Sequence, residues 1–206
     1  MRGLILLMAL GACRDDPGVA VYPDRPIFVD VGDDFFDGST PWEGQPRLSL
    51  GAFYEGGATE TVVIDDVVNH FYVYSSTFLV NLSTDRVEGL SADEIVASNV
   101  GWIGGGIHWD SPNDLSDWTT MHLALQSDNT DYNALTIGMN GGEVEVSVNA
   151  SDYGFVADGD WHDVTIPLGD FNGVDITQVG VALILLADGV GGGASLLVDD
   201  VYLNQE

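Results

Sequence analysis

The side chains with the clearest binding chemistry are aromatic rings that stand beside polar residues. Trp109 lies in the run HWDSPND and Tyr153 lies in NASDYGF, and neither run looks like a buried strand. Such rings stack on the C–H faces of sugars, while neighbouring polar groups bond to the hydroxyls. The candidate ligand-binding residues are Trp102, His108, Trp109, Asp110, Tyr132, Asn149, Tyr153 and Phe155. Each ring could instead cap the interior of the fold, so the pattern predicts a surface for a polyhydroxylated ligand without fixing which rings form it.

Residue types that several catalytic mechanisms need are absent from the sequence. All five basic residues are arginines, so the chain has no phosphate-loop lysine, kinase lysine or Schiff-base lysine. The histidines, at 70, 108, 122 and 162, lack the i, i+4 spacing of a metalloprotease helix. No Gly-x-Ser-x-Gly motif is present, and the only cysteine is Cys13. The sequence therefore excludes lysine-dependent phosphoryl transfer, Schiff-base catalysis, helix-based metalloproteases and hydrolases with a Gly-x-Ser-x-Gly nucleophile.

One pair of acids has to be weighed as a glycosidase pair. If Glu143 and Glu145 lie on one strand, their carboxylates share a face and lie roughly 6.5 to 7 Å apart. A retaining glycosidase needs about 5 to 5.5 Å and a surrounding cleft. The alternation of Glu and Val is more simply a solvated face above a buried one. We therefore expect no enzyme activity, with a polysaccharide hydrolase or lyase as the alternative.

The charge of the chain restricts its partners. There are 33 acidic residues against 5 basic ones, which gives a formal net charge of -28. Such a surface repels phosphate backbones and anionic lipids, so nucleic acid is excluded as a partner. It is compatible with calcium and with uncharged ligands. The expected partner is therefore a neutral polysaccharide or glycan, held weakly by one or two stacked rings.

The N-terminal run MRGLILLMALGAC has the parts of a secretory signal. Arg2 precedes an apolar run that is too short to cross a bilayer as a helix. Leu10-Gly11-Ala12-Cys13 resembles a bacterial lipobox, in which the cysteine becomes lipidated. An ordinary signal peptide is the alternative. The expected organisation is a signal peptide at 1–12, a tether at 13–27 and one domain at 28–206, lipid-anchored at a bacterial cell envelope and touching the membrane only through the lipid.

Strand signals recur about every eight to twelve residues, with glycine-, asparagine- and aspartate-rich turns between them. The predicted strands are 28–36, 47–54, 59–66, 70–82, 85–97, 102–109, 121–127, 135–139, 144–148, 161–168, 179–186 and 196–203. The segment 85–97 could instead begin a helical turn at Ser91. Turns are expected at 140–142 and 189–193, and the glycine run 101–106 indicates close backbone packing or a bulge. This pattern is typical of a sandwich or barrel.

The C-terminal half carries a family resemblance. Its order is a strand, an IPL-x-D-F turn, a strand, a glycine tip and a closing VDDVYL strand. This order resembles carbohydrate-binding-module β-sandwiches of the galactose-binding-like type, which include family 11 modules, over residues 85 to 203. The resemblance implies an all-β fold, a single jelly-roll-like antiparallel β-sandwich. It also places Trp118 (in DLSDW) and Trp161 (in DGDWHDV) in the core.

The same resemblance implies a structural Ca²⁺ where the first and last strands meet. Its candidate ligands are Asp33, Asp34, Glu88 and Asp199. Carboxylate and carbonyl oxygens on loops suit calcium better than magnesium. These acids could instead be charges that protect a sheet edge from pairing.

The sequence therefore predicts a non-catalytic, lipid-anchored envelope protein whose β-sandwich binds a neutral polysaccharide. A structural or adhesion protein without a sugar site stays open as an alternative.

Overall fold

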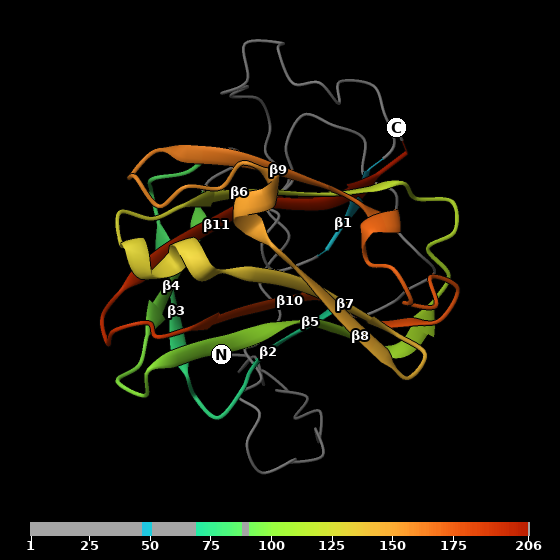
Figure 1. The fold of residues 1–206 in the computed structure, drawn as a ribbon, viewed down its shortest axis with the longest axis horizontal. Coiled ribbons are helices and arrows are strands. Elements are labelled where there is room, and N and C mark those ends of the chain that lie inside the picture. Colours follow the sequence, from blue (N-terminus) through green and yellow to red (C-terminus); the bar gives the residue numbers. More distant parts are fainter. Residues whose placement is uncertain (1–46, 51–68, 88–90, 206) are drawn as a thin grey trace, which may run out of the picture.

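The computed structural model describes residues 47–50, 69–87 and 91–205, which form eleven strands and three short 3-10 helices (Figure 1). The strands are β1 (Arg47–Ser49), β2 (Asn69–Val73), β3 (Phe78–Ser83), β4 (Ala92–Ala97), β5 (Trp102–Asn113), β6 (Thr120–Gln126), β7 (Thr136–Gly141), β8 (Val144–Asn149), β9 (Trp161–Pro167), β10 (Val179–Asp188) and β11 (Ser195–Asn204). The 3-10 helices are η1 (Thr130–Ala134), η2 (Ala150–Tyr153) and η3 (Leu168–Asp170). These residues contain no α-helix, and thus no helix that could cross a membrane.

The strands form two antiparallel sheets that pack face to face, as the two layers in Figure 1 show. One sheet has the order β3-β4-β11-β6-β9, and β1 pairs with the C-terminal end of β11. The other has the order β2-β5-β10-β7-β8. We call them the six-stranded and the five-stranded sheet, and the face of each that is turned away from the other sheet is its outer face. The all-β, jelly-roll-like sandwich expected from the sequence is confirmed.

Side-chain alternation builds the core between the sheets. Met121, Leu123 and Leu125 of β6 are fully buried, and so are Val164 and Ile166 of the neighbouring strand β9. Successive residues of a strand point to opposite faces, so these side chains all lie on the inner face. Burying a large aliphatic side chain contributes about 1.5–3 kcal/mol, and the core repeats this contribution over both sheets.

Most strands lie where the sequence predicts them. In the ambiguous segment 85–97 only residues 92–97 form a strand, β4, and residues 85–87 are irregular. The strand predicted at 70–82 is wrong, because a turn at Ser75 and Ser76 divides this segment into β2 and β3.

One hairpin also differs. Its turn was expected at 140–142, but β7 continues to Gly141 and the turn residues are Gly142 and Glu143. Glu143 therefore does not share a strand face with Glu145, which removes the geometric premise of a glycosidase pair. The strands predicted at 28–36 and 59–66 lie outside the described residues.

The connection that leaves β3 crosses the outer face of the six-stranded sheet. The backbone N–H of Val87 donates to Asp199 Oδ2 of β11 at 2.8 Å. The indole Nε1 of Trp161, on the opposite edge strand β9, donates to Asp85 Oδ1 at 3.0 Å. The segment 84–87 is thus fixed across that face.

Candidate functional site

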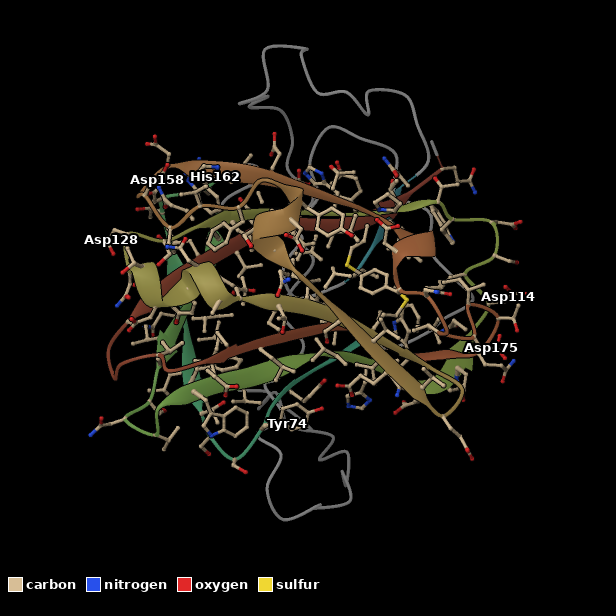
Figure 2. The ribbon with its side chains drawn as sticks, viewed as in Figure 1. Tyr74, Asp114, Asp128, Asp158, His162 and Asp175 are labelled. Carbon is tan, nitrogen blue, oxygen red and sulfur yellow. The ribbon has the colours of Figure 1, made fainter. Side chains whose placement is uncertain are left out.

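Four aromatic side chains lie together on the outer face of the five-stranded sheet, over β2 and β5. The rings of Tyr72 and Tyr74 meet edge to face with centroids 4.9 Å apart, and Tyr72 meets His108 at 5.6 Å. Trp102 lies further along β5. Figure 2 shows Tyr74 on the side of this sheet that is turned away from the six-stranded sheet. We call Tyr72, Tyr74, Trp102 and His108 the aromatic side of this face. Tyr72 is only 5% exposed, so the rings that a ligand can reach are those of Tyr74, Trp102 and His108.

Glycines bring these rings close to the sheet. A Cβ on Gly104 would collide with the Trp102 ring and would lie 3.0 Å from Tyr74 Cδ2, so both rings lie over this glycine. A Cβ on Gly106 would collide with the backbone carbonyl of Leu183, where the β5–β10 register shifts. The prediction of close packing or a bulge within 101–106 is therefore confirmed. The consequence is a flat floor on which the rings can lie.

Polar side chains occupy the other half of the same face, over β7 and β8. The register places Thr136 opposite Asn149, Gly138 opposite Ser147 and Asn140 opposite Glu145. Glu145, Ser147 and Asn149 are exposed, and Ser147 Oγ lies over Gly138, where a Cβ would be 2.5 Å away from it. We call Thr136, Asn140, Glu145, Ser147 and Asn149 the polar side. Hydroxyl, amide and carboxylate groups are the partners that sugar hydroxyls need.

The two sides are close enough to interact electrostatically. Burial raises the pKa of Tyr72, and the hydrogen bond and charge interaction with Tyr74 raise it further. The two hydroxyl oxygens lie 3.3 Å apart. The charge of Glu145, on the opposite edge strand, also raises the pKa of Tyr72. The rings over β2 and β5 and the hydrogen-bonding groups over β7 and β8 therefore belong to one face of a single sheet.

Three of the aromatic candidates are core residues, which corrects the sequence-based expectation. Trp109 is only 6% exposed and packs between the sheets, and Phe155 is buried in the same core. Tyr132 is fully buried, and its hydroxyl donates to the carbonyl of Ala194 at 3.2 Å. Burial raises its pKa, with the charge of Asp131 adding to the shift. None of these rings can stack on a ligand from solvent.

The remaining candidates divide between two places. Trp102 and His108 are half-buried on the aromatic side, and strand alternation puts exposed Asp110 at the same face. Tyr153 lies elsewhere, on η2, and its hydroxyl donates to Asp170 Oδ2 at 2.8 Å. Burial and this bond raise the pKa of Tyr153 to about 12. Tyr153 and Trp109 do not share an exposed face.

The two tryptophans that the resemblance placed in the core behave differently. Trp118 is 8% exposed and packs in the core, as expected. Trp161 is half-buried instead, on the outer face of the six-stranded sheet. Alternation explains this position, because Val164 and Ile166 point inward and Trp161 has the opposite parity.

Sequence reasoning missed Tyr72, Tyr74 and most of the polar side. The signal was available, since two tyrosines at i and i+2 of one strand must share a face. Glu145 and Ser147 follow the same rule on β8. The sequence alone does not show that β2 and β8 belong to the same sheet.

The calcium candidates are only partly covered by the structure. Asp33, Asp34 and Glu88 lie outside the described residues. Asp199 accepts the N–H of Val87 at Oδ2 and the N–H of Asp200 at Oδ1. In the part of the chain that is described, no three His, Cys, Asp or Glu residues are arranged to hold a metal ion. Asp199 is an oxygen donor of the right type, and its partners remain a prediction.

A hollow of about 480 Å³ opens at one end of the sandwich, between the turn before β6 and the loop after β9. Its lining consists of Ser116, Trp118, Thr119, Leu168, Gly169, Phe171, Asn172, Gly173, Val174 and Ile176. No side chain of this lining titrates near neutral pH, so the hollow has no general acid or base of its own.

Solved structures share this fold. No protein-family model and no curated protein matches the chain. The family 30 carbohydrate-binding module of a cellulosomal cellulase from Clostridium thermocellum is 19% identical, with a TM-score of 0.53 over 68% of this chain and 92% of the module. A second family 30 module is 16% identical, with a TM-score of 0.53 over 78% and 99%. A family 11 module of a Clostridium thermocellum cellulase covers 70% and 90% at 13% identity, with a TM-score of 0.42. The two family 30 structures establish the carbohydrate-binding-module type of β-sandwich as the fold of this chain.

Proposed function

We propose that this protein is a non-catalytic module that binds a glycan on the outer face of its five-stranded sheet. The observation that carries the proposal is the pairing of an aromatic side with a polar side on one face of a single sheet. Sugars present apolar C–H faces and hydroxyl edges, and this face offers a partner for each. The family 30 likeness supports the proposal at the level of the fold.

The negative charge of the protein indicates which class of glycan it binds. The chain carries 33 acidic residues, and none of its arginines lies on this face among the described residues. Glycans with carboxylate or sulfate groups would meet like charge with nothing to neutralise it. A neutral polysaccharide is therefore the first ligand to test.

Replacing the exposed rings should weaken binding without unfolding the protein. Trp102→Ala and Tyr74→Ala each remove a stacking surface whose interaction is about 0.5–1.5 kcal/mol, or roughly two- to tenfold in affinity. Affinity electrophoresis in gels of neutral polysaccharides would measure the loss, and thermal melts should stay nearly unchanged. Trp161→Ala is the matched control, because it removes a half-buried tryptophan from the other sheet.

The outcomes separate this proposal from its rivals. If no neutral polysaccharide retards the wild-type protein, a structural or adhesion role replaces glycan binding. If the protein releases reducing ends from a polysaccharide, it is a hydrolase or lyase. If Trp161→Ala weakens binding and Trp102→Ala does not, the site lies on the six-stranded sheet.

We also propose that the protein is lipid-anchored at a bacterial cell envelope through Cys13. Leu10-Gly11-Ala12-Cys13 after an apolar run supports this, and these residues lie outside the described part. Cys13→Ser should abolish palmitate labelling and move the protein from the detergent phase to the aqueous phase. Unchanged partitioning of this variant would show that Cys13 is not the anchor.

Calcium remains a proposal that a thermal melt can test. A ligand that binds only the folded state at a hundredfold excess over Kd stabilises it by about 2.7 kcal/mol. The melting temperature should therefore rise by about 5–10 °C in millimolar calcium relative to EGTA. Asp199→Asn should remove this rise. An equal rise with magnesium or sodium at matched ionic strength would indicate screening of the acidic surface instead.

A further inference from the structure

Three carboxylates lie on the proposed binding face. Asp110 interacts with other groups of the protein, so the two considered as ligand partners are Asp188 and Glu145. Asp188 ends β10 directly opposite Trp102 of β5, so both side chains lie on the outer face. Opposite residues of antiparallel strands have Cβ atoms about 4.5–5.5 Å apart. Asp188 is exposed, whereas Trp102 is half-buried. A ligand stacked on the Trp102 ring would therefore meet this carboxylate at its edge.

The second carboxylate belongs to Glu145 at the other end of the face. Glu145 is exposed on β8, opposite Asn140. Its charge reaches Tyr72, since it contributes to the raised pKa of that phenol. The binding face therefore has one carboxylate opposite the Trp102 ring, at the end of β10, and a second one, Glu145, on the polar side.

Neither carboxylate makes a hydrogen bond or ion pair within the part of the chain that the structure describes. Other acids are occupied in the fold, as Asp158 is by His162 at 2.8 Å and Asp170 is by Tyr153. Figure 2 shows Asp158 and His162 together at the six-stranded sheet, away from Tyr74 and the proposed binding face.

We propose that this face prefers sugars with a free amine, so that polymers of de-N-acetylated hexosamine bind more tightly than their N-acetylated or hydroxyl counterparts. The inference rests on the proposed function and names the substrate class of the same site. A protonated amino sugar stacks its C–H face on a ring and places its ammonium beside Asp188 or Glu145. The charge of the ammonium group is also attracted to the ring faces of Trp102 and Tyr74.

The size of the preference follows from the exposure of the groups. Solvent-exposed ion pairs contribute about 0.2–1 kcal/mol each, so each carboxylate should favour the amine by roughly 1.4- to fivefold. The two sites lie at opposite ends of the face and should act almost independently. A glucosamine tetrasaccharide should therefore bind about two- to 25-fold more tightly than the N-acetylglucosamine tetrasaccharide at low salt, and the difference should shrink as salt is added.

The experiment compares three tetrasaccharides, of glucosamine, N-acetylglucosamine and glucose, by isothermal titration calorimetry at about pH 5.5, where the amine is protonated and exposed carboxylates are ionised. Glu145→Gln and Asp188→Asn should each lower the affinity for the glucosamine tetrasaccharide by about 1.4- to fivefold and leave the affinity for the glucose tetrasaccharide unchanged. Glu143→Gln is the matched control, because it removes the same charge from the exposed turn two residues from Glu145.

Each result has a distinct meaning. Equal affinities for all three sugars, unaffected by Glu145→Gln and Asp188→Asn, would overturn the amine preference and leave glycan binding standing. An equal loss with Glu143→Gln would also overturn it, because the attraction would then belong to the net charge of the protein. Absence of binding to every sugar would refute the proposed function itself.

Discussion

A Gly106→Ala variant is expected to lose about 3 kcal/mol or more of folding free energy, which lowers the melting temperature by about 6–12 °C. The added methyl group would collide with the carbonyl oxygen of Leu183 and would lie 2.8 Å from its carbon and 3.0 Å from Ile184 Cα. All of these atoms belong to the backbone of β10, so no side chain can rotate away. The strands would have to separate in the centre of the five-stranded sheet.

The neighbouring strand supplies the control for this prediction. Gly180 lies on β10, has no positive φ, and an added Cβ would meet nothing within 4 Å. Gly180→Ala should therefore be neutral or stabilise the fold by about 0.4–1 kcal/mol, because it reduces the freedom of the unfolded chain. Thermal melts of both variants decide the question. Equal melting temperatures would show that the two strands do not approach as closely at Gly106 as the structure has them.

A Trp109→Ala variant is expected to lose about 3–5 kcal/mol, since the ring fills space between the two sheets. The cost combines the lost burial of the ring and the cavity that remains. Trp102→Ala, on the same strand but on the outer face, should cost far less while weakening glycan binding. The contrast between these two tryptophans separates a core residue from a ligand-binding one.

Chemical denaturation and affinity electrophoresis on the same samples would measure both effects. If Trp109→Ala does not fold, Trp109→Phe keeps most of the volume and should retain both the fold and the binding. A Trp109→Ala variant that melts like wild type but no longer binds glycan would place the ring at the surface and contradict the packing described above.

Local patterns in the sequence predict the strands and their buried faces well. Alternation in β6 and β9 indicates the inner face directly, since every second residue is aliphatic. The glycine run of β5 can also be interpreted from the sequence alone, because three adjacent glycines in a strand indicate that other backbone approaches closely. These features depend on residues that are neighbours in the chain, which is why they could be read.

The prediction for Trp109 was wrong because it relied on the polarity of the neighbouring residues and not on the alternation of side chains along the strand. Trp109 has the polar neighbours His108 and Asp110, which suggested an exposed ring. In a strand, polar neighbours belong to the opposite face, so they indicate a buried residue between them. The prediction failed because the strand was expected to end at Trp109, whereas β5 continues to Asn113.

The sequence by itself therefore determined an all-β chain, its strand positions and an acidic surface hostile to polyanions. Only the tertiary structure decided which side chains form one surface. Trp102 lies opposite Asp188 because β5 pairs with β10. Glu145 is close enough to raise the pKa of Tyr72 because β2 and β8 belong to the same sheet, which has the order β2-β5-β10-β7-β8. That order is fixed by hydrogen bonds between strands far apart in the chain, and their register depends on how the whole core packs. The residues of a binding face that spans five strands are far apart in the chain, so no single stretch of sequence indicates that they lie together.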